Sequence, residues 1–329
     1  MLIAVFVALA SAASYGVSDF YGGISSARLR VAPTSLIGYG CAAVTALVAL
    51  MFVGGDWSLG AVGWGALAGV LSITGTLLFY AALIAGPISI GAPIVGTTES
   101  AIPVIAGVLF GQQMPGLAWL AIVLAAAGGV LVSLRWGPAG TMTARAGVLA
   151  VAGGVLFGCS ILALDRAPHG AGLIPAVFIG VVGFAVMAAL LGTARLSGRV
   201  RRVLNLLDGM GGTDGMDGMG GTDGMGRTDG TGGTDSTDAG GAGSTQGSPG
   251  RGIRHALPAV VAGVLLGGGN VLLVLALRAG PLAVVAVLSD LYPVAAVLLA
   301  WFVARERLSL MQFAGVALAI GSSVLFALA

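Results

Sequence analysis

Apolar runs of about 20 residues follow one another along most of this chain, and a run of that length crosses a bilayer as a helix. Lipid offers no hydrogen bonds to the backbone, so spans of this kind must satisfy their own polar groups as helices. Charged residues make up only 9% of the 329 residues, too few for the surface of a soluble domain. The sequence therefore predicts an all-α integral membrane protein with ten transmembrane helices. The predicted spans are 2–24, 33–53, 60–84, 88–110, 116–135, 146–164, 172–193, 256–277, 282–303 and 309–328.

An internal repeat relates the two halves of the chain. An offset of 194 positions aligns residues 68–87 with 262–281, with eleven of twenty residues identical, and a weaker offset of 142 relates the first two spans to the sixth and seventh. Each copy holds five spans, and because five is odd the second copy enters the membrane the other way up, which is typical of transporters. We expect two inverted five-helix repeats, at 1–136 and at 145–196 with 253–329.

A segment rich in Gly, Thr, Asp and Met separates the seventh span from the eighth. Residues 197–252 contain seven of the thirteen acids of the chain and few side chains that could form a core. We therefore predict a disordered insert in the second repeat.

The arginines predict the orientation in the membrane. Thirteen of the fifteen lie in the insert or in loops after odd-numbered spans, and Arg166 and Arg278 lie in loops after even-numbered spans. Basic loops stay in the cytoplasm. The sequence thus predicts a multi-pass protein of the cytoplasmic (inner) membrane with a cytoplasmic insert and both termini outside.

Three acids lie at predicted membrane depth: Asp19, Glu99 and Asp290. A charge at the bilayer centre costs about 3 kcal/mol or more, so such residues generally face a cavity or a partner. The repeat counterpart of Asp290 is Gly96, and Glu99 lies one helical turn beyond it on the same face. We hypothesise that these carboxyls bind a proton or a cationic group of a substrate. The alternative is a set of buried acids that are hydrogen-bonded for structure alone.

Several neutral polar residues are further candidates for substrate contacts. Asn270, its repeat counterpart Thr76, and Tyr292 could offer hydrogen bonds, although contacts between helices explain them equally well. Close helix packing is also predicted by glycine pairs four residues apart, at 65/69, 107/111, 154/158 and 263/267.

Motifs of enzymes and metal sites are absent from the sequence. It has no P-loop, no paired-histidine metal motif and no Gly-x-Ser-x-Gly. We therefore expect no enzymatic activity, no catalytic residues, no cofactor and no metal. The expected partners are the lipid bilayer, a small-molecule substrate and protons, with no nucleic acid. Formation of a homodimer is left open.

Family motifs lie chiefly in the second copy. They are ALRAGP (276–281), LYPVAAVLLAWFVARERLS (291–309), Gln312 and Gly315, together with SYGVSDFYGG (14–23) in the first span. On these residues the chain resembles the EamA-type family of the drug/metabolite transporter superfamily over nearly its whole length outside the insert. The resemblance implies ten helices in two inverted repeats, a central cavity, alternating access, and export of amino acids, metabolites or toxic compounds.

This chain departs from the family pattern in its first copy. The family's acid after helix 9 maps onto Glu306, but its counterpart after helix 4 is Gln112, and the proline kept as Pro293 is replaced by Glu99. Glu99 is thus expected to be specific to this protein.

The sequence predicts a secondary transporter that exports small metabolites such as amino acids, with proton exchange as the hypothesis for coupling. One alternative is uptake or exchange of sugar-type solutes, and sites for sugars linked to nucleotides should carry basic residues at depth. The other is a structural or lipid-handling membrane protein that transports nothing.

Overall fold

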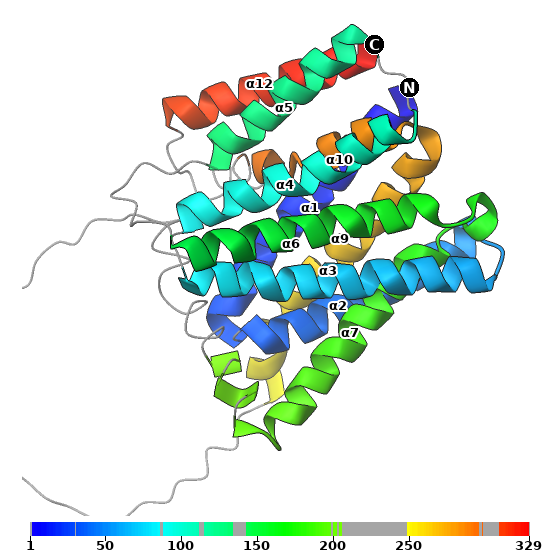
Figure 1. Cartoon of the computed structure of the whole chain (residues 1–329). Helices are drawn as coiled ribbons and strands as arrows, with labels where there is room; N and C mark the ends of the chain where they lie inside the picture. Colours follow the sequence, from blue (N-terminus) through cyan, green and yellow to red (C-terminus); the bar gives the residue numbers. More distant parts are fainter. Residues whose placement is uncertain are drawn as a thin grey trace, which may run out of the picture.

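The computed structural model is a bundle of helices, and the described residues contain no strand (Figure 1). Those residues are 2–29, 31–85, 88–111, 115–133, 143–198, 200–202, 204–205, 249–295, 298 and 309–328. The predicted disorder of the insert concerns mainly residues 206–248, which lie outside the described part of the chain. So do Gln112 and Glu306.

Each predicted span contains an apolar helix. Six helices are long and apolar enough to cross a membrane, and four of the described apolar helices are shorter, at Ile94–Leu109, Gly116–Leu131, Leu282–Ala295 and Leu310–Phe326. The structure therefore supports a multi-pass helical membrane protein. The elements are α1 (Leu2–Leu29), α2 (Val31–Val53), α3 (Leu59–Ala85), α4 (Ile88–Leu109), α5 (Gly116–Ser133), α6 (Ala144–Arg166), the 3₁₀ turn η1 (His169–Ala171), α7 (Ile174–Ala194), α9 (Pro249–Ala279), α10 (Leu282–Ser289) and α12 (Leu310–Leu328).

Hydroxyl side chains fix the starts of three helices. Ser58 accepts a hydrogen bond from the Ala61 N–H at the start of α3, and Thr143 accepts one from Ala146 at the start of α6. At the start of α12, the Ser309 hydroxyl accepts from the Gln312 N–H at 3.2 Å, and the Gln312 side chain accepts from the Ser309 N–H at 3.1 Å. This reciprocal pair is a capping box.

The predicted span 282–303 is interrupted by a turn in its described part, 282–295 and 298. α10 ends at Ser289, Asp290 and Leu291 form a turn, and the helix resumes at Tyr292. Pro293 favours this turn, because it has no N–H to donate to the Ser289 carbonyl and its ring clashes with that carbonyl in a continuous helix.

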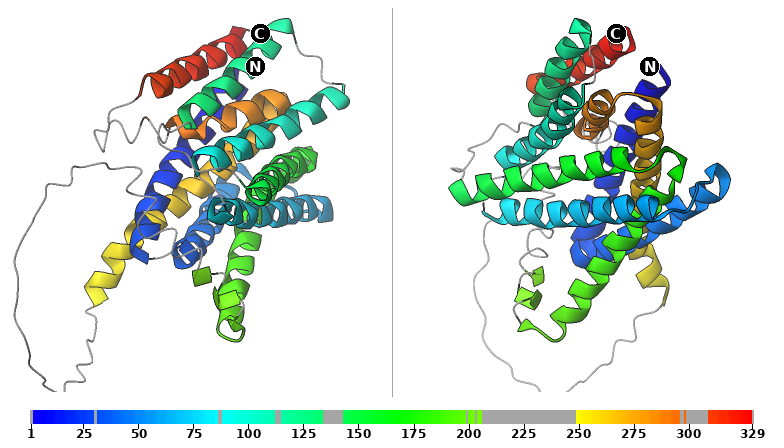
Figure 2. Two further views of the ribbon diagram at one scale, coloured as in Figure 1. Left: turned by 60° about the vertical axis from the view of Figure 1, so that its left-hand side comes forward. Right: turned by 45° about the vertical axis from the view of Figure 1, so that its right-hand side comes forward.

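The helix contacts come in pairs. In each pair, one contact becomes the other when both helices are replaced by their repeat counterparts from the other half of the chain. α1 packs on α9 as α3 packs on α6, α2 packs on α9 as α7 packs on α3, and α1 contacts α10 as α6 contacts α4. α5 and α12 lie side by side at one edge of the bundle (Figures 1 and 2).

Individual contacts repeat with the same offsets. The Ser18 hydroxyl donates to the Ala262 carbonyl at 2.8 Å, and 142 positions later Ser160 donates at 2.8 Å to Ala68, which is the counterpart of Ala262 at offset 194. Both hydroxyls join helices that pack closely, since the two serines are buried.

Glycines set the distance between the helices. A Cβ on Gly65 would lie 2.7 Å from Pro175 Cα of α7, one on Gly154 would lie 2.6 Å from the Val95 carbonyl oxygen of α4, and one on Gly267 would lie 2.6 Å from a carbonyl oxygen of α2. Close packing is thus confirmed for the pairs 65/69, 154/158 and 263/267. It is wrong for Gly111, which follows α4 with a φ of +77° and has open space around it.

The loops that follow even-numbered predicted spans meet on one side of the bundle. The Asp56 N–H after α2 donates to the Gly170 carbonyl after α6 at 2.7 Å, and the Arg166 guanidinium lies 3.8 Å from the centre of the Phe110 ring after α4. The N-terminal turn of α1 also reaches this side. Its residue Ala4 lies against Gly280, which directly follows α9, since an added Cβ on Gly280 would lie 2.4 Å from Ala4 Cβ.

We predict that Gly158→Ala in α6 destabilises the protein by about 1–3 kcal/mol, because the added Cβ would lie 2.7 Å from the Glu99 carbonyl oxygen. Thermal unfolding of the purified protein in detergent measures the effect. Gly147→Ala, in the same helix with nothing within 4 Å of the added carbon, is the matched control. Equal melting temperatures for the two variants would contradict the packing role of Gly158.

Candidate functional site

The break after α10 presents Asp290 at the end of a helix inside the bundle. The Asp290 N–H donates to the Ala286 carbonyl at 3.0 Å, after which the Leu291 N–H bonds the Leu288 carbonyl at 3.3 Å in a tighter turn. Ser289, directly before the break, is 2% exposed, and its hydroxyl has no hydrogen-bond partner among the described residues. Such a break at membrane depth frees polar backbone, which is tolerated only where protein or a water-filled cavity surrounds it.

Acids from three helices meet at this break. The Ser100 hydroxyl of α4 donates a short hydrogen bond to Asp290 Oδ2. Glu99, next to Ser100, interacts electrostatically with Asp290 and with Asp19 of α1. The structure therefore places Asp19 and Asp290 within electrostatic range of Glu99, so that all three acids that the sequence predicts at depth lie in one region of the bundle. We call Asp19, Glu99 and Asp290 the acid cluster.

The three members of the acid cluster differ in how much of the side chain lies at the surface of the protein. The Asp19 side chain is exposed, and those of Glu99 and Asp290 are half-buried. The electrostatic partners that the structure gives these three groups, within its described part, are other acids and tyrosines, with no basic side chain. A cationic group would therefore meet uncompensated carboxyls.

Tyrosines surround the acid cluster. Tyr292, where the helix resumes after the break, and Tyr15, from α1, each interact electrostatically with all three acids. Aromatic rings beside carboxylates form a favourable environment for an ammonium group, because the ring face carries partial negative charge.

The remaining two predicted residues, Asn270 and Thr76, are each hydrogen-bonded to a tyrosine. The Tyr15 hydroxyl donates to Asn270 Oδ1 of α9 at 2.7 Å. The Thr76 hydroxyl of α3 lies 3.4 Å from that of Tyr39 and donates to the Ser72 carbonyl at 3.0 Å. Both residues act in contacts between or within helices, so their contact with a substrate stays a prediction.

Two residues at the site were missed by the sequence reasoning. Ser100 follows Glu99 directly, so its position one step along the helix was the available signal. Tyr39 of α2 packs its ring against Gly183, where a Cβ would lie 2.3 Å from its Cδ1 atom. Its signal was a polar residue in the middle of an apolar span.

A metal centre finds no support in the described residues. No group of three His, Cys, Asp or Glu side chains among them is arranged to hold a metal ion.

One part of the chain matches a known protein family. Residues 243–328 match the EamA-like transporter family. This match covers the C-terminal part of the chain, from the end of the insert to α12. This match fits the drug/metabolite transporter superfamily, whose EamA members are transporters of small solutes and not enzymes.

Solved structures share the fold over nearly the whole chain. One, described as "Crystal structure of protein", superposes with a TM-score of 0.63 over 99% of this chain and 96% of its own, at 13% sequence identity. At that identity the likeness concerns the fold alone. No curated protein matches the sequence.

We predict that Tyr15→Phe lowers the stability by about 1 kcal/mol, because it removes the hydroxyl that donates to Asn270, a residue only 7% exposed. Thermal unfolding in detergent is the measurement. Tyr21→Phe, in the same helix with its ring edge-on to Phe20, serves as the control. If both variants melt together, the Tyr15–Asn270 bond contributes nothing to the fold.

Proposed function

We propose that this protein is a secondary transporter of the cytoplasmic membrane that exports small metabolites bearing an amino group, such as amino acids. The observation that carries the proposal is the acid cluster: three carboxyls from α1, α4 and the break after α10, with no basic partner among the described residues. The cluster binds either the substrate's ammonium group or protons, and these two cations compete for it. Competition of this kind couples export to proton entry.

Alternating access is supported by the duplicated contacts. In the proposed inverted repeats, ten spans form two halves that rock about a site near the membrane midplane. The serine hydrogen bonds at Ser18 and Ser160 and the paired helix contacts repeat with the offsets of the sequence duplication. Two equivalent sets of contacts allow the two halves to exchange conformations. The break after α10 lies at the proposed site.

The orientation rests on the basic loops. The loops after α2, α4 and α6 meet on one side of the bundle, and that side holds few arginines in the sequence. We assign it to the outside and the insert to the cytoplasm.

The lack of basic partners for the acid cluster among the described residues favours transport over a structural or lipid-handling role. A structural set of acids is expected to be paired off, whereas no basic side chain pairs with these acids in the described part of the chain. Sugar-type solutes linked to nucleotides are disfavoured, because none of the fifteen arginines lies at predicted membrane depth.

We predict that Asp290→Asn and Glu99→Gln each reduce substrate export at least about tenfold, or about 1.4 kcal/mol, because the amide cannot carry the charge that binds the ammonium group or exchange the proton. The measurement is a metabolite-efflux profile of cells that express each variant at matched levels. Asp56→Asn, in an exposed loop, is the control. An unchanged profile in both site variants would sink the proposal.

A further inference from the structure

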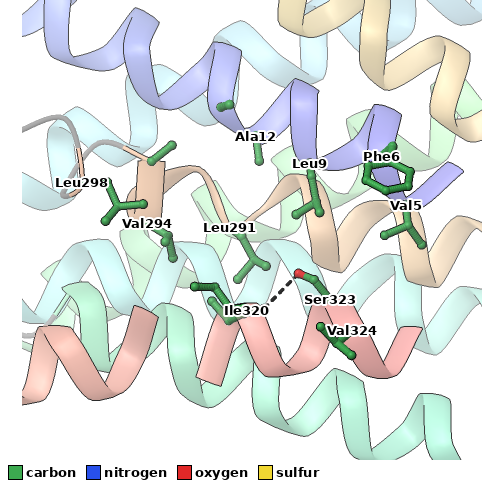
Figure 3. A pocket seen from close by; sticks show the side chains of 13 residues that line it. Val5, Phe6, Leu9, Ala12, Leu291, Val294, Leu298, Ile320, Ser323 and Val324 are labelled. Carbon is green, nitrogen blue, oxygen red and sulfur yellow. Dashed lines mark hydrogen bonds between the residues drawn. The ribbon is translucent and has the colours of Figure 1, made fainter. Parts of the chain in front are cut away.

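Two cavities of this bundle differ in the chemistry of their walls. An apolar groove of about 350 Å³ lies between α1, the chain after α10 and α12 (Figure 3), and no charged side chain lines it in the described part of the chain. The hydroxyl of Ser323 on its wall is already bonded to the Ala319 carbonyl. The other cavity has a volume of about 290 Å³ and carries two arginines.

The charged cavity lies where α2 begins and α7 ends. Its polar side chains are those of Arg195, Arg201 and Asn205, and its apolar wall includes Leu191 and Leu204. We call it the arginine pocket. The membrane span of α2 begins at the pocket and that of α7 ends there, so the pocket lies at the membrane surface.

The chain turns after α7 to form the arginine pocket. The Ser197 N–H donates to the Thr193 carbonyl at 2.8 Å, after which helical residues follow. Leu204 of that segment is 6% exposed, because it packs in one cluster with Ala32 of α2 and Leu191 of α7. The two arginines, one at the turn and one after it, therefore share a packed support.

Both guanidinium groups of the arginine pocket are free to bind an anion. Arg195 and Arg201 are exposed, and neither side chain has an ion pair or a hydrogen bond with the described residues. No acid lines the pocket in this part of the chain, and the Asn205 amide adds a neutral donor. Guanidinium groups form charge-assisted and often bidentate hydrogen bonds to phosphate. The pocket thus offers such donors beside apolar side chains.

The repeat shows that this cationic cavity belongs to one end of the α2–α7 pair. At offset 142, Arg195 corresponds to Val53. At the other end of the same pair the backbone fills the space, because an added Cβ on Gly172 would clash with the Gly54 carbonyl oxygen. The duplicated architecture alone therefore does not account for the arginine pocket.

We propose that the arginine pocket binds the headgroup of an anionic phospholipid. The lipid phosphate accepts hydrogen bonds from Arg195 and Arg201, and its glycerol backbone lies against Leu191 and Leu204. Basic pockets between helices at the cytoplasmic membrane surface bind anionic headgroups, and the orientation proposed above assigns this end of the bundle to the cytoplasm. The site requires the membrane-spanning fold and is independent of transport.

The test titrates the full chain, freed of lipid in a neutral detergent, with short-chain phosphatidylglycerol. Native mass spectrometry measures the bound fraction. Phosphatidylcholine with the same acyl chains is the comparison, and we expect its affinity to be at least about fivefold lower, because it carries no net charge for the arginines to attract.

Arg195→Gln and Arg201→Gln each remove one guanidinium from the pocket. We expect each to weaken phosphatidylglycerol binding at least about tenfold, because a charged hydrogen bond is lost. Arg202→Gln is the matched control, since Arg202 is exposed, directly follows Arg201 and does not line the pocket. It keeps the wild-type affinity.

The control separates a built site from the general effect of basic residues, which fix the orientation of a membrane protein by charge alone. A loss confined to the two pocket variants supports the proposal. If all three variants weaken binding equally, the charge of the segment attracts the lipid and the pocket is refuted. Equal binding of the two lipids also overturns the proposal. If inorganic phosphate displaces phosphatidylglycerol at a similar concentration, the pocket holds a free anion and the lipid site is rejected.

Discussion

Close approach of helix backbones at glycine is the constraint on which this bundle depends. Lipid tails are as apolar as the side chains of the spans, so burial of apolar surface does little to hold membrane helices together, and packing contacts must do it. Gly154 and Gly158 of α6 bring α4 so near that an added Cβ on Gly158 would lie 2.7 Å from the Glu99 carbonyl oxygen. Gly263 and Gly267 of α9 do the same for α2. The position of Glu99 thus depends on residues that carry no charge.

Much of this arrangement could be predicted from the sequence, because helix spans and repeats leave periodic signals. The offsets of 142 and 194 predicted which residues correspond, and the hydrogen bonds of Ser18 and Ser160 follow those offsets. The acids at depth were recognisable from their cost in lipid, and the structure brings Asp19, Glu99 and Asp290 together. Their role in transport stays a prediction.

Other features depend on contacts between distant segments and leave no local signal. The bond from Ser100 to Asp290 joins residues 190 positions apart, and the place of Tyr39 beside Thr76 depends on how α2 meets α3. Pro293 was visible, but a proline in a membrane helix can kink it without ending it. The loss of helix at Asp290 therefore needed the structure. The shape of the corresponding helix in the first copy also needed the structure. There, α4 runs unbroken through Glu99, the residue aligned with Pro293.

The aromatic contacts of α1 and α6 have a consequence for how such a protein evolves. A Cβ on Gly269 would lie 2.7 Å from the Tyr15 ring, and in the other copy a Cβ on Gly75 would lie 3.1 Å from the Phe157 ring. The two contacts have the same shape and differ by one hydroxyl group. Duplication therefore leaves the glycines under selection in both copies, while a hydroxyl can be gained or lost on either ring with little steric effect. A lineage can in this way alter the hydrogen bonds inside the bundle while its architecture is inherited unchanged.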